Sequence, residues 1–211
     1  MTKLYLLGGE NVAKRDARRI NEAAFSDAGE APAVIVFSWA RAAFDQPHKR
    51  RKLLLNYFRS LGAFTVDFAD YSDTLEEICE KVELSDIIYL PGGLASVLVE
   101  RLKNKKVDKL LRKFEGVVVG RSAGALALGK KCVVTKNRRN PKSEMIRGIG
   151  LVNFSIKAHY KPSKDAALKY LSKKDKIYAI PERSALVYES GVLSSMGDVY
   201  LFQNGEKTRV D

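Results

Sequence analysis

Residues 120–124 read Gly-Arg-Ser-Ala-Gly, which matches the G-x-S-x-G pattern of a nucleophile elbow. A valine-rich run precedes the pattern, and a stretch of small residues typical of a helix follows it. A strand that turns sharply into a helix brings the residues on either side of the turn close together, which explains the two glycines. The N–H groups at the start of such a helix can stabilise an oxyanion. The pattern therefore predicts that Ser122 is a nucleophile, and the alternative is a strand–helix turn with a serine cap.

A serine nucleophile needs a base, and the sequence contains two histidines, His48 and His159. His48 lies in the basic stretch "DQPHKRRK", which is typical of an exposed helix start. His159 follows a strand-like stretch and precedes a helix that begins at a proline. That position places His159 on a loop at a strand end, so it is the candidate base by elimination.

A histidine base is usually oriented by a carboxylate, which fixes its tautomer. Glu182 follows the strand-like stretch "IYAI" and is the first candidate, with Glu189 and Asp198 as further candidates. The alternative for Glu182 is a turn residue paired with a nearby lysine or arginine. The order Ser…His…Glu differs from the Ser…Asp/Glu…His order of α/β-hydrolases, which disfavours an ordinary lipase or esterase fold.

The elements that must position these residues alternate between apolar strands and amphipathic helices. The predicted strands cover residues 3–7, 33–38, 64–68, 86–90 and 116–120, and the predicted helices cover 13–28, 48–62, 74–84 and 96–115, the last with a break. After a final helix at 162–174, short strand-like runs with tight turns predict an antiparallel extension. We therefore expect an α/β fold with three layers, in which a mainly parallel, doubly wound sheet carries helices on both faces.

Composition limits the class of protein further. The chain has 211 residues, of which 45% are hydrophobic, and we expect one domain over residues 1–211. The net charge of +12 could attract nucleic acid, but the charge is dispersed and no nucleic-acid-binding motif accompanies it, so we expect no such role. No apolar run approaches the roughly 20 residues that cross a bilayer, and we expect a cytoplasmic protein without membrane contact.

Taken together, these residues resemble the serine peptidase family of aspartyl dipeptidase (dipeptidase E) and cyanophycinase. The similar segments are "LYLLGGEN", "VIVFSWA", "IIYLPGG", "GRSAGALALG", "IKAHY" and "AIPERSALV". The resemblance implies a class I glutamine amidotransferase-like fold and a triad in which Ser122 is the nucleophile, His159 the base and Glu182 the orienting acid. It also implies an oxyanion hole formed by the N–H groups of Gly93 and Ala123.

The resemblance further implies hydrolysis of peptide bonds in small peptides without a metal or organic cofactor, by a monomer or a homodimer. Glutamine amidotransferases of the same fold use a cysteine at the elbow, where this chain has Ser122. Two features depart from the family pattern. Residues 92–95 read Gly-Gly-Leu-Ala where the family usually has Gly-Gly-Asn-Thr, and the segment between His159 and Glu182 is short. These departures affect the expected substrate preference.

Basic residues near the elbow are candidates for binding an acidic substrate group. Arg121 lies inside the elbow pattern, and Arg138 and Arg139 lie in the basic stretch "TKNRRNPK", for which the alternative is a solvated loop. The expected partner is thus a small peptide, with an acidic peptide as one option. Two other functions stay open from the sequence: an esterase or amidase that acts on a non-peptide substrate, and a non-catalytic protein that binds acidic partners through its basic surface.

Overall fold

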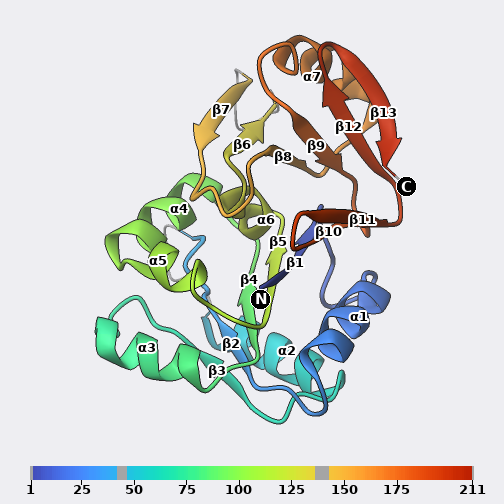
Figure 1. The fold of residues 1–211 in the computed structure, drawn as a ribbon. Helices are drawn as coiled ribbons and strands as arrows, with labels where there is room; N and C mark the ends of the chain where they lie inside the picture. Colours follow the sequence, from blue (N-terminus) through green and yellow to red (C-terminus); the bar gives the residue numbers. More distant parts are fainter. Residues whose placement is uncertain (1, 42–46, 136–142, 211) are drawn as a thin grey trace.

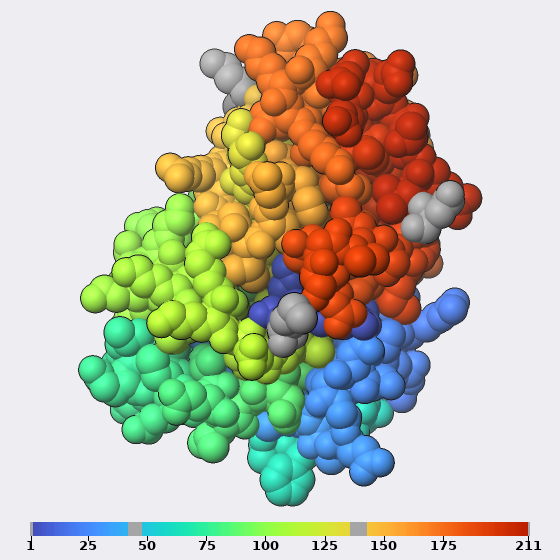
Figure 2. All heavy atoms as spheres, in the orientation of Figure 1, coloured from blue at the N-terminus to red at the C-terminus, as the bar shows by residue number. Residues whose placement is uncertain are grey.

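The structure is a computed structural model that describes residues 2–41, 47–135 and 143–210. These residues form two β-sheets with helices between and around them (Figure 1). In the space-filling view, C-terminal residues coloured orange and red gather at one end of the molecule, and N-terminal residues gather at the other (Figure 2).

The larger sheet has seven strands in the order β11-β10-β1-β5-β4-β2-β3. Its strands are β1 (Lys3–Leu7), β2 (Val34–Val36), β3 (Val66–Phe68), β4 (Ile87–Leu90), β5 (Val117–Arg121), β10 (Ala185–Glu189) and β11 (Val192–Met196). The neighbours among β1 to β5 pair in parallel, whereas β10 pairs antiparallel with both β1 and β11. Every residue of β4 is buried, as its apolar run "IIYL" requires for a strand covered on both faces. The mainly parallel sheet and its antiparallel C-terminal extension were both predicted and are confirmed.

Helices cover both faces of this sheet. Along β1, Leu4 and Leu6 point into one apolar cluster and Tyr5 and Leu7 into another, as the alternation of a strand dictates. The cluster of Tyr5 includes α1 (Arg18–Ala28) and α2 (Pro47–Arg59). The cluster of Leu4 includes α3 (Leu75–Glu83), α4 (Ala95–Asn104), α5 (Val107–Leu111) and α6 (Ala123–Leu128). The predicted three-layer α/β arrangement is therefore confirmed.

A second, six-stranded sheet runs in the order β13-β12-β9-β8-β6-β7. Its strands are β6 (Lys131–Val134), β7 (Glu144–Arg147), β8 (Ser155–Ala158), β9 (Ile177–Ile180), β12 (Val199–Gln203) and β13 (Glu206–Val210). The strand β8 lies parallel to β6 and β9, and the other pairs are antiparallel. The sequence patterns did not predict that these strands form a sheet separate from the first one. Helix α6 shares an apolar cluster with Ile156 and Tyr178 of the second sheet, and α7 (Asp165–Leu171), after a short 3₁₀ turn (Pro162–Lys164), packs through Leu168 against another of its apolar clusters.

Most local features of the predicted helices are present in the structure. Helix α3 begins at a capping box, in which the Glu77 N–H donates to Thr74 Oγ1 at 3.2 Å and the Thr74 N–H donates to the Glu77 carboxylate at 2.7 Å. The break predicted within residues 96–115 falls at Lys106, which has a φ of 59°. Helix α1 begins at Arg18 rather than near residue 13, because Arg15 has a φ of 52° that no α-helix accommodates. Among the described residues, no helix is long and apolar enough to cross a membrane.

Candidate active site

Ser122 occupies the turn between β5 and α6 with a strained backbone, at φ 54° and ψ −106°. Such a conformation costs on the order of 1–3 kcal/mol and persists only where the surroundings enforce it. Here the Ser122 N–H donates to the carbonyl of Leu7 at 2.9 Å, and the Ser122 carbonyl accepts from the Leu126 N–H at 2.9 Å. The strand pairing with β1 and the start of α6 therefore fix the nucleophile elbow from both sides.

The two glycines of the pattern are required by close backbone contacts. A Cβ on Gly120 would lie 2.8 Å from the backbone nitrogen of Ala125 and 2.8 Å from the carbonyl carbon of Gly124. A Cβ on Gly124 would lie 2.0 Å from the carbonyl oxygen of Leu90 in β4. The elbow and its helix can therefore pack against the sheet only while both positions lack a side chain.

The structure brings the three residues of the predicted triad together. Ser122 Oγ lies 2.6 Å from His159 Nε2, and Nδ1 of the same ring is hydrogen-bonded to Glu182 Oε1. His159 follows β8 and Glu182 follows β9, and because these strands are parallel neighbours, their carboxyl ends meet at one edge of the second sheet. The ring can thus accept the Ser122 proton at Nε2 while it donates from Nδ1 to the carboxylate.

The loop after β1 connects the segments that carry His159 and Glu182 to the first sheet through backbone hydrogen bonds. The His159 N–H donates to the Gly8 carbonyl at 3.0 Å, and the Arg183 N–H donates to the Gly9 carbonyl at 2.9 Å. A Cβ on Gly9 would lie 2.1 Å from Glu182 Oε2 and 2.7 Å from His159 Cε1, so a side chain there would displace both groups. The backbone at His159 and Arg183 also has positive φ, of 51° and 59°.

The other acidic candidates have different partners. Glu189 pairs with Lys3 at 3.3 Å, and Asp198 pairs with Arg209 at 2.9 Å. The His159 side chain is 47% exposed and that of Glu182 is 48% exposed, so the pair is open to solvent. Of the three carboxylates considered from the sequence, only Glu182 contacts the histidine beside Ser122.

The residues predicted to form the oxyanion hole, Gly93 and Ala123, lie in the turn after β4 and at the start of α6. A Cβ on Gly92 would lie 3.4 Å from Ser122 Cβ and 3.7 Å from its Oγ, so Gly92 lies against the Ser122 side chain. The next residue, Gly93, cannot carry a side chain, because its Cβ would lie 2.2 Å from the Ala40 carbonyl oxygen. Ala123 is the first residue of α6, where helix N–H groups have no partner within the helix.

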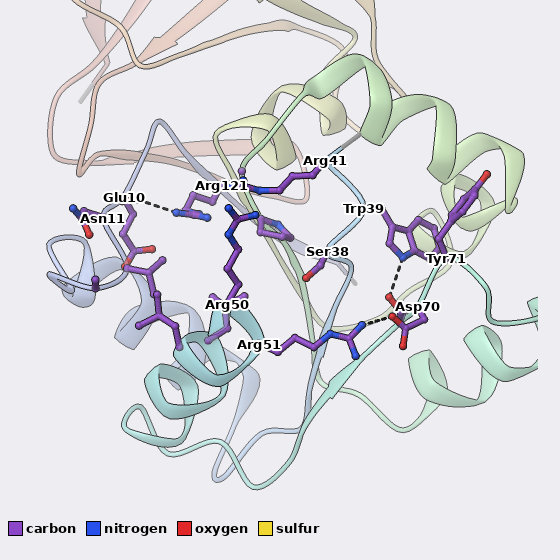
Figure 3. Close-up of a pocket in the computed structure, with 17 residues that line it drawn as sticks. Glu10, Asn11, Ser38, Trp39, Arg41, Arg50, Arg51, Asp70, Tyr71 and Arg121 are labelled. Carbon is purple, nitrogen blue, oxygen red and sulfur yellow. Dashed lines mark hydrogen bonds and ion pairs between the residues drawn. The ribbon is translucent and has the colours of Figure 1, made fainter. Parts of the chain in front are cut away.

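A cavity of about 390 Å³ lies beside the elbow, along the carboxyl ends of strands β1 to β5 (Figure 3). Gly92 and Arg121 form the wall nearest Ser122. Figure 3 shows Arg121 directed toward Glu10, whose carbonyl accepts from Arg121 Nη1 at 2.9 Å, and shows Trp39 and Tyr71 at the opposite end. The cavity can therefore offer both charged and aromatic contacts to a ligand.

Of the basic residues predicted to bind substrate, Arg121 alone is placed at this cavity by the structure, since Arg138 and Arg139 lie outside the described residues. Glu10 and Trp39 also line the cavity and were not among the predicted site residues. Both residues come within a few residues of the carboxyl end of a predicted parallel strand. Ligands bind at such strand ends in open α/β sheets, so this position could have identified both as candidate site residues.

Glu10 is the centre of a buried polar network under the cavity. Its side chain accepts from Asn21 Nδ2 at 3.1 Å, and the same amide donates to the Tyr57 hydroxyl at 3.0 Å. Burial raises the pKa of Glu10, an effect that the nearby Tyr57 hydroxyl and the Arg121 charge oppose. Burial likewise raises the pKa of Tyr57 and of Tyr89, which is close enough to Arg121 and Glu10 to sense their charges.

The chain is similar to several known peptidases. The model of peptidase family S51 matches residues 41–196. A protein of Listeria monocytogenes that is named only as an uncharacterized peptidase is 27% identical over 139 residues, which cover 60% of this chain and 68% of that protein. A peptidase of Listeria innocua, also named as uncharacterized, is 28% identical over 107 residues, which cover 47% of this chain and 51% of that protein.

Two solved structures have the same fold. The crystal structure of a peptidase from an acI-B1 actinobacterium superposes with a TM-score of 0.78 at 21% identity, covering 100% of this chain and 94% of that one. The crystal structure of a candidate peptidase E protein from Listeria monocytogenes superposes with a TM-score of 0.71 at 22% identity, covering 93% of this chain and 98% of that one.

Proposed function

Because this chain belongs to peptidase family S51 and is a serine-type peptidase, we propose that it hydrolyses small peptides through Ser122, His159 and Glu182. The observation that carries the proposal is the 2.6 Å contact between Ser122 Oγ and His159 Nε2, with Glu182 bonded to the other ring nitrogen. A serine hydroxyl is a weak nucleophile at neutral pH, and a base within hydrogen-bond distance is what activates it.

In the proposed reaction, His159 Nε2 accepts the hydroxyl proton as Ser122 Oγ attacks the carbonyl carbon of the peptide bond. The N–H groups of Gly93 and Ala123 stabilise the negative charge that develops on the carbonyl oxygen. The His159 imidazolium, stabilised by Glu182, then donates its proton to the leaving amine as the C–N bond breaks. Water attacks the resulting acyl-enzyme, with His159 again acting as the base, and releases the acid. These steps use no metal or organic cofactor.

We propose that the cavity beside Gly92 holds the acyl side of the substrate, and that Arg121 is a substrate-binding residue there. Arg121 lines this cavity and donates from Nη1 to the Glu10 carbonyl at 2.9 Å, while its Nε atom is buried without a hydrogen-bond partner among the described residues. A guanidinium edge matches the two oxygens of a carboxylate. An acidic group on the peptide is therefore the substrate feature that we expect Arg121 to bind.

The test of the proposed chemistry is covalent labelling by a fluorophosphonate, a probe whose phosphorus is attacked by an activated serine hydroxyl, with loss of fluoride, to give a phosphonate ester. We expect one adduct on the native protein, and peptide mapping by mass spectrometry should locate it on Ser122. Heat-denatured protein is the control, because labelling must depend on the folded site. An unlabelled Ser122, or an adduct on another serine, would contradict the proposal.

Replacing Glu182 by glutamine should lower kcat by roughly 10²- to 10⁴-fold, with the larger value approached only if water cannot substitute for the carboxylate. A glutamine NH₂ group can donate to His159 Nδ1, which leaves the proton on Nε2 and prevents that nitrogen from accepting the Ser122 proton. Steady-state peptide hydrolysis measures the effect.

Glu189→Gln is the matched control for this change, since Glu189 pairs with Lys3 on the first sheet and has no contact with His159. The control should keep the activity of the parent protein. A Glu182→Gln variant that kept half or more of the parent kcat would show that the carboxylate does not orient the base.

We propose further that residues 1–211 form one peptidase domain that acts in the cytoplasm as a monomer or homodimer. The cluster that joins α6 to both sheets supports the single domain. Light scattering after size-exclusion chromatography measures the oligomeric state, and cell fractionation measures the location. Two separate unfolding transitions would contradict the single domain.

A further inference from the structure

His159 lies in a bulge at the carboxyl end of β8. The Ser155 N–H donates to the Lys176 carbonyl at 2.9 Å, and steps of two residues along these parallel strands would bring the His159 N–H to the Ile180 carbonyl. Instead, the Tyr160 N–H donates to the Ile180 carbonyl at 3.1 Å. The strand therefore has one extra residue at His159, and a bulge of this kind changes the direction in which a side chain projects.

Two hydrogen bonds fix the peptide unit that leads into the bulge. On one side, the His159 N–H donates to the Gly8 carbonyl at 3.0 Å. On the other side, the Ala158 carbonyl accepts from Nζ of Lys157. Rotation of this peptide unit would change the φ of His159, which is 51°, and with it the direction of the imidazole. Lys157 therefore restrains the backbone from which the imidazole projects.

Lys157 is an unusual side chain for its place in the fold, because it is buried on an apolar face of the second sheet. It is 9% exposed and lies in register with Ala179, which belongs to the apolar cluster of Leu168 and Phe202. A lysine is seldom buried, and taking its ammonium group out of water costs free energy unless a hydrogen bond compensates. The bond to the backbone carbonyl is the compensation that the structure provides.

Other charged groups around this face have partners of their own. The charged and titratable residues on the strands beside β8 and on the segments that cover it include Lys131, Tyr160, Lys164, Asp165, Tyr200 and Lys207. Asp165 pairs with Lys207 at 3.0 Å, and Lys131 pairs with Asp175 at 2.8 Å. These two carboxylates are therefore engaged by other lysines, and the ammonium group of Lys157 is bonded to the backbone instead.

We propose that Lys157 is a positioning residue of the triad, which holds the bulge so that Nε2 of His159 faces Ser122 Oγ. This inference rests on the proposed function, since it takes His159 to be the base. A charged donor forms a stronger hydrogen bond than a neutral one, so the ammonium group restrains the peptide unit better than a neutral amine does.

The same burial makes this restraint depend on pH. Burial lowers the pKa of Lys157 from its ordinary value of 10.5 to about 8, and the charge of Lys164 adds to the effect. In the folded protein the amine therefore loses its charge above about pH 8, whereas in the unfolded chain it keeps its charge up to about pH 10.5. Between these values the unfolded chain binds more protons, so the contribution of Lys157 to the free energy of unfolding rises with pH. Its hydrogen bond to the Ala158 carbonyl weakens over the same range.

Replacing Lys157 by methionine should lower kcat for the dipeptide Asp-Leu by roughly 10- to 100-fold at neutral pH, because a misplaced catalytic group slows the reaction. KM should stay within about twofold, since the described residues that line the cavity beside the elbow do not include Lys157. In the parent protein, kcat should fall as the pH rises through about 8, and this decline should be absent from Lys157→Met. Lys157→Arg, whose guanidinium stays charged, should retain activity above that pH. Lys164→Met should move the decline to higher pH.

Thermal unfolding separates positioning from a purely structural role. The Tm of the parent relative to that of Lys157→Met should rise between about pH 8 and about pH 10.5, where the parent loses activity. Lys174→Met is the matched control, because Lys174 is exposed beyond the end of α7, and it should leave kcat and its pH profile unchanged. A Lys157→Met variant with the kcat and the pH profile of the parent would overturn the inference. So would a variant that loses kcat and Tm in parallel over the whole pH range.

Nuclear magnetic resonance of isotope-labelled histidine keeps this inference separate from the proposed chemistry, because it requires no turnover. In Ser122→Ala, the backbone amide signal of His159 should shift with a midpoint near pH 8. This transition should be absent from the Ser122→Ala, Lys157→Met double variant, and His48 provides the reference signal. That pair of results supports the role of Lys157 even if Asp-Leu is not hydrolysed. Ser122-dependent hydrolysis, together with a His159 signal that does not respond to Lys157→Met, would leave the proposed function intact and reject the role of Lys157.

Discussion

Replacing Ser122 by alanine should lower kcat for peptide hydrolysis by roughly 10⁴- to 10⁶-fold, which is the loss of kcat typical of serine peptidases whose nucleophile has been removed. The substitution removes the oxygen that contacts His159 Nε2, and no other described hydroxyl is hydrogen-bonded to that ring. Any residual rate would come from the oxyanion hole and from substrate binding, which survive the loss of the nucleophile. Progress curves with a small peptide at high enzyme concentration measure the remaining activity.

Ser26→Ala is the control for this variant, because Ser26 is an exposed serine on α1 far along the chain from the elbow. It should match the parent protein in rate and in fluorophosphonate labelling. A Ser122→Ala variant with more than about a hundredth of the parent rate would mean that another group carries the reaction, since losing a nucleophile costs far more than that.

Replacing Gly124 by alanine should destabilise the protein by about 3 kcal/mol, at the upper end of the usual cost of overpacking. The added Cβ would lie 2.0 Å from the carbonyl oxygen of Leu90, and backbone of a central strand cannot move away as a flexible side chain could. Helix α6 must therefore shift, and with it the Ser122 backbone and the Ala123 N–H. Thermal unfolding should show a lowered Tm, and the folded fraction should have impaired activity.

Gly129→Ala makes the same change at the other end of α6 and serves as the comparison. Its φ of −69° suits any residue, and the nearest atoms to an added Cβ are those of the Ile156 side chain, 3.1 Å away. A smaller loss of stability is expected there, because that side chain can adjust. Equal Tm values for the two variants would show that the contact between Gly124 and Leu90 is not what requires glycine.

The parallel sheet was predictable because buried parallel strands have a simple sequence signature. Runs such as "VVVG" and "IIYL" separate amphipathic helices at regular intervals, and that alternation permits few arrangements. Helix boundaries were accurate where a local signal fixed them, as the capping box of Thr74 and Glu77 did. The start of α1 was predicted too early, because nothing in the sequence near Arg15 marks the positive φ that keeps this stretch out of the helix.

The second sheet was not predictable on the same grounds. The strands "IYAI" and "VYLFQ" have strand-like patterns, but a pattern specifies which faces are buried and not which strand lies alongside. The parallel pairing of β8 with β6 and β9 depends on contacts between residues far apart in the chain, with α6 packed between the two sheets. The antiparallel prediction was correct for β10 and β11, where a tight turn joins consecutive strands.

The candidate triad could be read from the sequence because few residues competed for each role. With two histidines in the chain, one of them in an exposed basic segment, the choice of His159 needed no knowledge of the fold. Glu10 was missed for the opposite reason. A glutamate in a polar loop is normally exposed, and only the packing of α1 and α2 beneath the loop buries it beside Asn21 and Tyr57.

In the proposed reaction, the solvent exposure of His159 and Glu182 means that a bound substrate would change the surroundings of this pair. In the free protein, water screens the attraction between the developing imidazolium and the carboxylate, so that the pair interacts weakly. A peptide that covers His159 and Glu182 would displace this water and lower the local dielectric constant, and the same pair would then stabilise the transition state more strongly. Peptides that shield the two side chains more completely should therefore react faster once bound, even where they contribute no additional hydrogen bond.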